Sequence, residues 1–120
     1  MARVLIVDDS PTELMKLRTA LETEGFQVTE ANSGDDAIAK AKAQRPDIIV
    51  MDVVMPGMNG FQATRTLTRD PDTKDVPIVV CSSKSQETDK LWAKRQGASD
   101  YVVKPVKPDE LVGKIRALLR

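Results

Sequence analysis

The stretch LIVDDSPTE (residues 5–13) joins the end of a buried strand, two adjacent carboxylates and the start of a helix. The apolar residues predict the strand, and Ser10 with Glu13 fits the N-cap and capping box of the helix that follows. Asp8 and Asp9 stand between these two elements. Two like charges about 4 Å apart repel by roughly 4 kcal/mol at an effective dielectric near 20, so such a pair calls for a cation nearby.

The same succession of a short apolar run and a longer amphipathic segment occurs five times along the chain. The first, third and fourth apolar runs are nearly continuous, which is typical of strands that helices cover on both faces. The predicted strands are residues 3–7, 27–31, 47–51, 77–81 and 100–103. The predicted helices begin after Ser10, near 32–33, at 59–60, near 85 and at 108, and the fourth runs over roughly 85–96. This alternation predicts an α/β fold, a doubly wound five-stranded parallel sheet with five helices.

Size and composition limit the classes of protein that fit. A chain of 120 residues suits one compact domain, and we expect a single domain over residues 1–120 with no output domain after its last helix. Eighteen basic residues balance eighteen acidic ones, which argues against nucleic-acid binding. The N-terminal apolar run is too short for a signal sequence or a membrane span, so we expect a cytoplasmic protein.

Two further counts exclude specific chemistry. The chain has no histidine, which excludes histidine-based acid–base catalysis, histidine metal ligands and a phosphohistidine within this chain. Its one cysteine, Cys81, excludes an internal disulfide. Because Cys81 lies in a strand-like apolar run, we expect a small buried side chain.

Polar side chains follow four of the five predicted strands. Asp8 and Asp9 follow the first, Asp52 the third, Ser82 the fourth and Lys104 the fifth. In parallel α/β sheets, ligands bind outside the carboxyl ends of the strands, so these groups should converge on one edge. Asp9 and Asp52 can hold Mg²⁺, with Asp8 helping directly or through a water. An aspartate can accept a phosphoryl group, and a lysine can neutralise the charge on the phosphoryl oxygens. The set therefore predicts Mg²⁺-dependent phosphoryl transfer to a carboxylate.

The motifs that carry these residues are LIVDDSPTE (5–13), DIIVMDVVMPGMNG (47–60), VVCSSK (79–84) and DYVVKPV (100–106). In this order they resemble the receiver domain of bacterial response regulators, whose fold is the flavodoxin-like CheY fold, over essentially the whole chain. The resemblance implies the following roles: phosphoacceptor for Asp52, acidic pair for Asp8 and Asp9, a metal-binding backbone carbonyl for Val54, switch residues Ser82 and Tyr101, and the family's lysine for Lys104.

A narrower resemblance lies in NGFQATR (59–65) and QETDKLWAKRQGA (86–98). These segments are similar to stand-alone receivers of the PilH type, which belong to chemotaxis-like systems controlling type IV pili and twitching motility. The resemblance implies a histidine kinase as phosphodonor and a downstream motility or signalling protein, bound at the face of the fourth helix, fifth strand and fifth helix. It also implies a monomer that catalyses only its own phosphorylation and dephosphorylation.

Three other classes of protein share parts of this pattern and are alternative interpretations of the sequence. A flavodoxin-like cofactor carrier needs a phosphate-binding first loop, whereas this loop carries two negative charges. A haloacid-dehalogenase-like phosphatase needs a second acid two residues after its nucleophile, where this chain has Val54. A pseudo-receiver that binds a partner without phosphorylation remains an alternative, although the acids, Ser82 and Lys104 argue against it.

Three residues have two interpretations each. Val54 and Lys84, each two residues after a site residue, either influence phosphoryl-group lifetime or are simply packed or solvated. Trp92 is the only tryptophan. It either anchors its helix to the core or forms a partner surface with Lys90, Lys94 and Tyr101.

Overall fold

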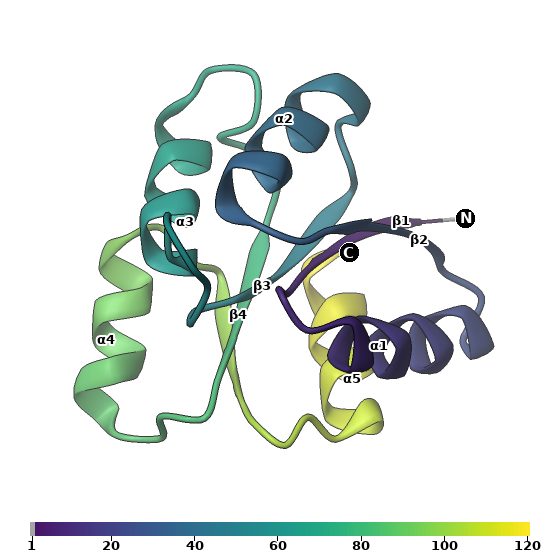
Figure 1. Cartoon of the computed structure of the whole chain (residues 1–120). Helices are drawn as coiled ribbons and strands as arrows, with labels where there is room; N and C mark the ends of the chain where they lie inside the picture. The colour runs from purple at the N-terminus through teal and green to yellow at the C-terminus, as the bar shows by residue number, and fades with distance from the viewer. Residues whose placement is uncertain (1) are drawn as a thin grey trace.

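The protein is described by a computed structural model over residues 2–120, in which strands and helices alternate (Figure 1). The strands are β1 (Arg3–Val7), β2 (Gln27–Ala31), β3 (Ile48–Asp52), β4 (Ile78–Ser82) and β5 (Asp100–Val103). The helices are α1 (Pro11–Thr23), α2 (Gly34–Gln44), α3 (Gly60–Arg69), α4 (Glu87–Arg95) and α5 (Pro108–Leu118). Each strand begins and ends within one residue of its predicted bounds, so the predicted succession of elements is confirmed.

The five strands form one parallel sheet in the order β2-β1-β3-β4-β5. The chain first moves outward from β1 to β2, and then returns to the other side of β1 with β3. The strand order therefore reverses between β1 and β3, where the polar ends of both strands emerge. This switch point is the usual ligand crevice of an open α/β sheet.

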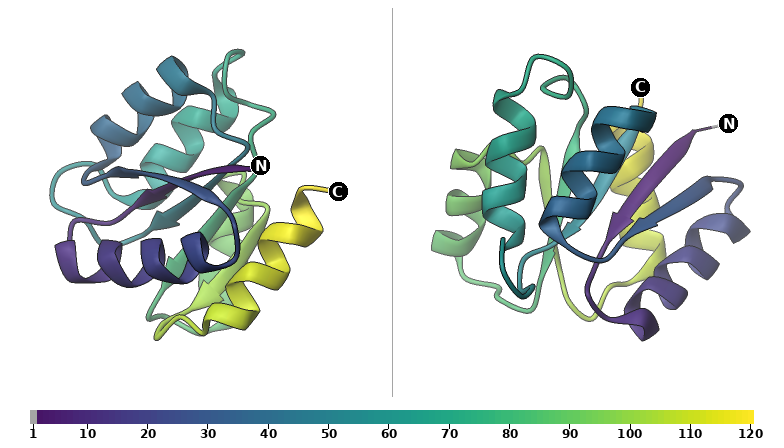
Figure 2. Two further views of the ribbon diagram at one scale, coloured as in Figure 1. Left: turned by 90° about the vertical axis from the view of Figure 1, so that its right-hand side faces the viewer. Right: turned by 45° about the horizontal axis from the view of Figure 1, so that its top comes forward.

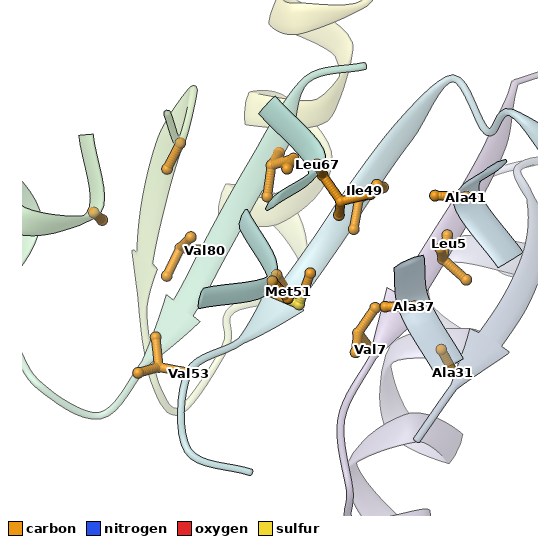
Figure 3. Close-up of a cluster of buried hydrophobic side chains, with 14 of the residues drawn as sticks. Leu5, Val7, Ala31, Ala37, Ala41, Ile49, Met51, Val53, Leu67 and Val80 are labelled. Atoms are coloured by element: carbon orange, nitrogen blue, oxygen red, sulfur yellow. The ribbon is translucent and has the colours of Figure 1, made fainter. Parts of the chain in front are cut away.

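Helices cover both faces of the sheet, with α1 and α5 on one face and α2, α3 and α4 on the other (Figures 1 and 2). Alternate strand residues point to opposite faces, so β1 sends Val4 and Ile6 to the first layer and Leu5 and Val7 to the second. Figure 3 shows the second layer, where small alanines of α2 lie over the larger strand residues. The inner strands β1, β3 and β4 are buried almost throughout, which explains their nearly continuous apolar runs.

The helix starts show how local sequence places the first site residues. The Ser10 hydroxyl accepts a hydrogen bond from the Glu13 backbone N–H at 3.3 Å, as an N-cap should. The predicted capping box is only half formed, because the Ser10 N–H donates to Asp8 Oδ1 at 3.0 Å rather than to Glu13. A complete capping box occurs at α3, where Asn59 and Gln62 bond reciprocally.

The fourth helix is shorter than predicted and is weakly anchored. It runs over Glu87–Arg95 rather than roughly 85–96, and its N-cap residue Gln86 makes no side-chain capping bond. Its only buried residue is Ala93. Within residues 2–120, no helix is long and apolar enough to cross a membrane.

Candidate functional site

The carboxyl ends of β1 and β3 bring three carboxylates together, as the sequence predicts. One oxygen from each of Asp8, Asp9 and Asp52 lies within 4.8 Å of the others. Asp8 and Asp52 are buried, whereas Asp9 is exposed at the rim. The cluster thus combines two acids shielded from solvent with a third that is accessible to solvent.

Lys104 reaches this cluster from the end of β5. Its ammonium lies 2.8 Å from Asp52 Oδ1 and 3.1 Å from Asp8 Oδ2. The Lys104 backbone N–H also donates to the Ser82 carbonyl at 2.8 Å, which ties the end of β5 to the end of β4. Lys104 therefore supplies one cation to three carboxylates, and the site keeps an excess of negative charge.

The pKa values of Asp52 and Lys104 are both shifted by this excess of negative charge and by burial. Burial raises the pKa of Asp52 and the neighbouring charge of Asp8 adds to the rise, although the hydrogen bond from Lys104 opposes it. Burial alone would lower the pKa of Lys104, but its hydrogen bonds to Asp52 and Asp8 outweigh burial and raise it above the usual value. Lys104 therefore stays protonated and positively charged, but its single charge does not neutralise the carboxylates around it.

The oxygens that remain free suit a divalent cation. Both oxygens of Asp8 are engaged, by the Ser10 N–H and by Lys104. Within residues 2–120, no hydrogen bond or ion pair uses Asp52 Oδ2, either oxygen of Asp9 or the Val54 carbonyl. Hard oxygen donors next to uncompensated charge are what Mg²⁺ prefers, so the residues present fit the metal that the sequence analysis predicts.

Gly60 is a further site residue, which the sequence predicts only as the start of a helix. A side-chain carbon at Gly60 would overlap the backbone carbonyl of Asp52, and the Gly60 N–H donates to the Val53 carbonyl at 2.9 Å. The first turn of α3 therefore closes directly on the backbone that carries Asp52. The sequence signal for this contact is weak, since Asn-Gly before a helix has several explanations.

Ser82 and Tyr101 meet through the backbone of one residue. The Ser82 hydroxyl accepts a hydrogen bond from the Lys84 N–H at 3.2 Å, and the Tyr101 hydroxyl donates to the Lys84 carbonyl at 2.9 Å. Ser82 and the Tyr101 side chain are both buried. Ser82 directly follows Cys81, the residue of β4 that pairs with Asp52 in the sheet. A group bound at Asp52 would thus lie beside the start of a hydrogen-bonded path to Tyr101.

Comparison with known proteins shows the family of the chain. The profile of the response regulator receiver domain matches residues 4–116. The chain therefore belongs to the response regulator receiver domain family, which confirms the resemblance noted in the sequence.

Individual relatives place the chain more narrowly within the family. It is 55% identical to the protein PilH of Pseudomonas aeruginosa over 119 residues, which are 99% of this chain and 98% of PilH. It is 40% identical to the DNA-binding response regulator MtrA of Mycolicibacterium smegmatis over 118 residues, 98% of this chain but only 50% of MtrA. The structure of the chemotaxis protein CheY4 of Vibrio cholerae superposes with a TM-score of 0.93 at 34% identity, covering 99% of both chains. The CheY-like fold is thereby confirmed.

Proposed function

We propose that this receiver accepts a phosphoryl group on Asp52 in a Mg²⁺-dependent reaction, with a histidine kinase as the donor. The observation that carries the proposal is the position of Lys104, whose ammonium joins the two buried acids Asp8 and Asp52. A buried acid that served only the fold would be better compensated, because uncompensated charge is costly inside a protein.

The chemistry follows from the free oxygen of Asp52. That oxygen forms a bond to phosphorus while the bond from phosphorus to the donor's imidazole nitrogen breaks, and the imidazole leaves. Lys104 faces the transferred group and offsets the charge on its oxygens. Asp9, Asp52 and the Val54 carbonyl would hold Mg²⁺, with Asp8 at the base of the site. When bound, the metal would neutralise phosphoryl oxygens and allow the donor's negative charge to approach the acids.

The signal would leave the site through Ser82. A phosphoryl group on Asp52 adds negative charge and hydrogen-bond acceptors. The Ser82 hydroxyl would turn toward the phosphoryl group to donate a hydrogen bond to one of its oxygens. The Lys84 backbone would then shift, and Tyr101 with it. We propose that this changes the face formed by α4, β5 and α5, where a downstream motility or signalling protein binds.

We also propose the oligomeric state, the location and the signalling pathway of this receiver. We infer that residues 1–120 act as one monomeric, cytoplasmic receiver that catalyses only its own phosphorylation and dephosphorylation. The identity to PilH and the similarity of residues 59–65 and 86–98 to PilH-type regulators support a chemotaxis-like pathway that controls twitching motility. Phosphotransfer from the purified kinase of such a pathway is the direct test of this assignment.

The phosphoacceptor itself is tested with a small donor. The full chain is incubated with acetyl phosphate and Mg²⁺, and its intact mass is measured. We expect the gain of one phosphoryl group, removed by hydroxylamine, in the natural chain and in Asp75→Asn, an exposed acid far from the site. Asp52→Asn should show no gain, and undiminished labelling of Asp52→Asn would refute the assignment.

A further inference from the structure

Two charged side chains hold the backbone of the predicted switch residue Tyr101. Its N–H donates a hydrogen bond of 2.7 Å to Oδ1 of Asp100, the residue before it. Its carbonyl accepts a hydrogen bond of 2.7 Å from the ammonium of Lys114 on α5. The same ammonium lies 3.2 Å from Asp100 Oδ1, so one carboxylate oxygen and one ammonium close a ring with the Tyr101 backbone. We call Asp100 and Lys114 the Tyr101 clamp.

The position of β5 explains why its backbone is open to such bonds. β5 is the last strand in the order β2-β1-β3-β4-β5, so only one of its two sides pairs with another strand. Backbone groups on the free side of an edge strand need water or another partner. At Tyr101 the clamp supplies these partners, one of them from α5, which packs against β5. The clamp therefore ties the edge strand to α5 at this residue.

The clamp acts on position more than on stability. The side chains of Lys114 and Asp100 are 32% and 38% exposed, and an ion pair so open to solvent stabilises a fold very little. Among residues 2–120, Tyr101 is the only strand residue whose N–H and carbonyl both bond to side chains. Its hydroxyl donates to the Lys84 carbonyl, so Tyr101 is held at its backbone and at the tip of its ring.

Lys114 also lies within the surface that a change at Tyr101 would alter. Two surface hollows on this side of the molecule share Lys90, Tyr101 and Lys114 among their lining residues. Movement of the Tyr101 ring would therefore change the shape of both hollows. The residues that hold Tyr101 thus determine what the face of α4, β5 and α5 presents to a partner.

Trp92 fits neither of the two interpretations that its sequence position allows. Half of Trp92 (50%) is exposed, and α4 buries Ala93 alone, so Trp92 is not a buried anchor. Lys90 and Lys94 line a hollow together with Tyr101, but Trp92 lines neither hollow beside Tyr101. The surface around Tyr101 therefore depends on the clamp and on these lysines.

We propose that Asp100 and Lys114 are positioning residues of the switch, which fix the backbone of Tyr101 so that movement at Lys84 turns the tyrosine ring instead of displacing β5. This role rests on the proposed function, because phosphorylation of Asp52 has to move Lys84 first. A side chain that responds to a small shift needs a fixed point of attachment, which supporting side chains provide. Without the clamp, the same shift would be spread along the edge strand.

Amide hydrogen exchange in the full chain tests the clamp without any phosphoryl group. Lys114→Met keeps an unbranched side chain and removes the ammonium, so the Tyr101 N–H should exchange at least about tenfold faster. Lys94→Met makes the same charge change at an exposed lysine of the same surface and should leave the rate within about twofold. Urea denaturation of both variants should change little, so that faster exchange reports local opening rather than global unfolding.

A double-mutant cycle tests whether the two residues act as one unit. Asp100→Ala and Lys114→Met should each accelerate exchange at Tyr101, and their combination should exceed the larger single effect by no more than about twofold. Lys114→Arg, whose guanidinium can donate to both oxygens, should restore most of the protection.

Beryllofluoride with Mg²⁺ tests the role in switching, followed by NMR. In the natural chain and in Lys94→Met, the Tyr101 ring should shift strongly and the β5 amides weakly. In Lys114→Met, the ratio of ring shift to amide shift should fall at least about twofold, and Lys114→Arg should recover it. A loss of stability alone does not change this ratio. Labelling of Asp52 by acetyl phosphate should be equal in all four proteins, because the clamp does not touch the site.

Three outcomes would overturn the proposal. The first is unchanged exchange at Tyr101 in Lys114→Met. The second is an equal effect of Lys94→Met, which would assign the result to the charge of the surface. The third is normal labelling of Asp52 with an unchanged ratio of ring shift to amide shift in Lys114→Met, which would overturn the role in switching alone. A natural chain that is neither labelled nor shifted by beryllofluoride would instead overturn the proposed function and this role with it.

Discussion

The hydroxyl of Tyr101 donates a hydrogen bond of 2.9 Å to the backbone carbonyl of Lys84. The N–H of the same residue donates to Ser82 at 3.2 Å, so the peptide units around Lys84 hold both predicted switch residues. Burial raises the pKa of Tyr101, which keeps its hydroxyl protonated as a donor. A change at Ser82 therefore has a short route, of two hydrogen bonds joined by the Lys84 backbone, to a residue of the α4, β5 and α5 face.

This route predicts coupled movement on addition of beryllofluoride and Mg²⁺, which mimic the phosphoryl group. In NMR spectra we expect shifts at Ser82, Lys84 and Tyr101 together. In Tyr101→Phe, which lacks the hydroxyl, the shift at Ser82 should persist while the response of residue 101 is reduced. Asp52→Asn is the control and should show none of these changes. Shifts confined to Asp52 and its neighbours in the natural chain would count against the route.

The metal site predicts opposite effects of one substitution on affinity and stability. Asp9→Ala removes an exposed carboxylate with no partner within residues 2–120, so Mg²⁺ affinity should fall about tenfold or more. Without metal, loss of its repulsion with Asp8 and Asp52 should raise Tm by a few degrees. Calorimetric titration and thermal unfolding measure the two effects, with Asp75→Ala as the matched exposed acid. Unchanged Mg²⁺ affinity in Asp9→Ala would rule out the site as described.

The fold and the arrangement of the site residues follow from the sequence because both depend on local pattern. Apolar runs on parallel strands place Asp8, Asp52 and Lys104 at one edge whatever the details of packing. The contacts that the sequence did not predict depend on how separate elements pack against one another. Gly60 closing on Asp52 depends on the position of α3 against the end of β3, and Thr68 bonding Gln96 depends on the position of α3 against α4. Hydrophobic periodicity within one element does not determine either position.

Two buried threonines predict stability changes of opposite sign. Thr64 is fully buried, and its hydroxyl has no hydrogen-bond partner among residues 2–120. Thr64→Val keeps the shape and removes the unpaired group, so it should stabilise the protein by about 1 kcal/mol. Thr73 is equally buried, but its hydroxyl donates to the Leu67 carbonyl at 2.7 Å, so Thr73→Val should destabilise by about 1–2 kcal/mol. Urea denaturation compares them, and destabilisation by both would contradict the prediction for Thr64.

Cys81 predicts a loss of stability at alkaline pH. Burial raises the pKa of its thiol to about 12, so the folded state holds the proton more tightly than the unfolded state, whose thiol has a pKa near 9. The stabilisation is complete below about pH 9 and is lost at about 1.4 kcal/mol per pH unit as the pH rises toward 12. In Cys81→Ala, the free energy of unfolding, measured by urea denaturation, should fall less steeply between about pH 9 and pH 12. Parallel declines in both proteins would show that Cys81 does not contribute.

The last prediction concerns the lifetime of the phosphoryl group on Asp52. Hydrolysis needs a water in line with phosphorus, and positioned polar side chains accelerate that attack. Val54 is 68% exposed beside the site, and its side chain has no polar group to hold a water. Lys84 is exposed with no ion pair within residues 2–120, so its ammonium is free to hold a phosphoryl oxygen. We therefore expect Val54→Asn combined with Lys84→Glu to lose the group about tenfold faster, about 1.4 kcal/mol in barrier.

The single substitutions Val54→Asn and Lys84→Glu separate the two contributions to this lifetime, and Lys74→Glu controls for a change of charge at an exposed lysine outside the site. Each protein is phosphorylated, the donor is removed, and the intact mass is followed with time. The natural chain and Lys74→Glu should decay alike, because neither the water position nor the phosphoryl contact changes. Decay of the natural chain as fast as that of the double variant would refute the role of both residues and leave the phosphoacceptor assignment unaffected.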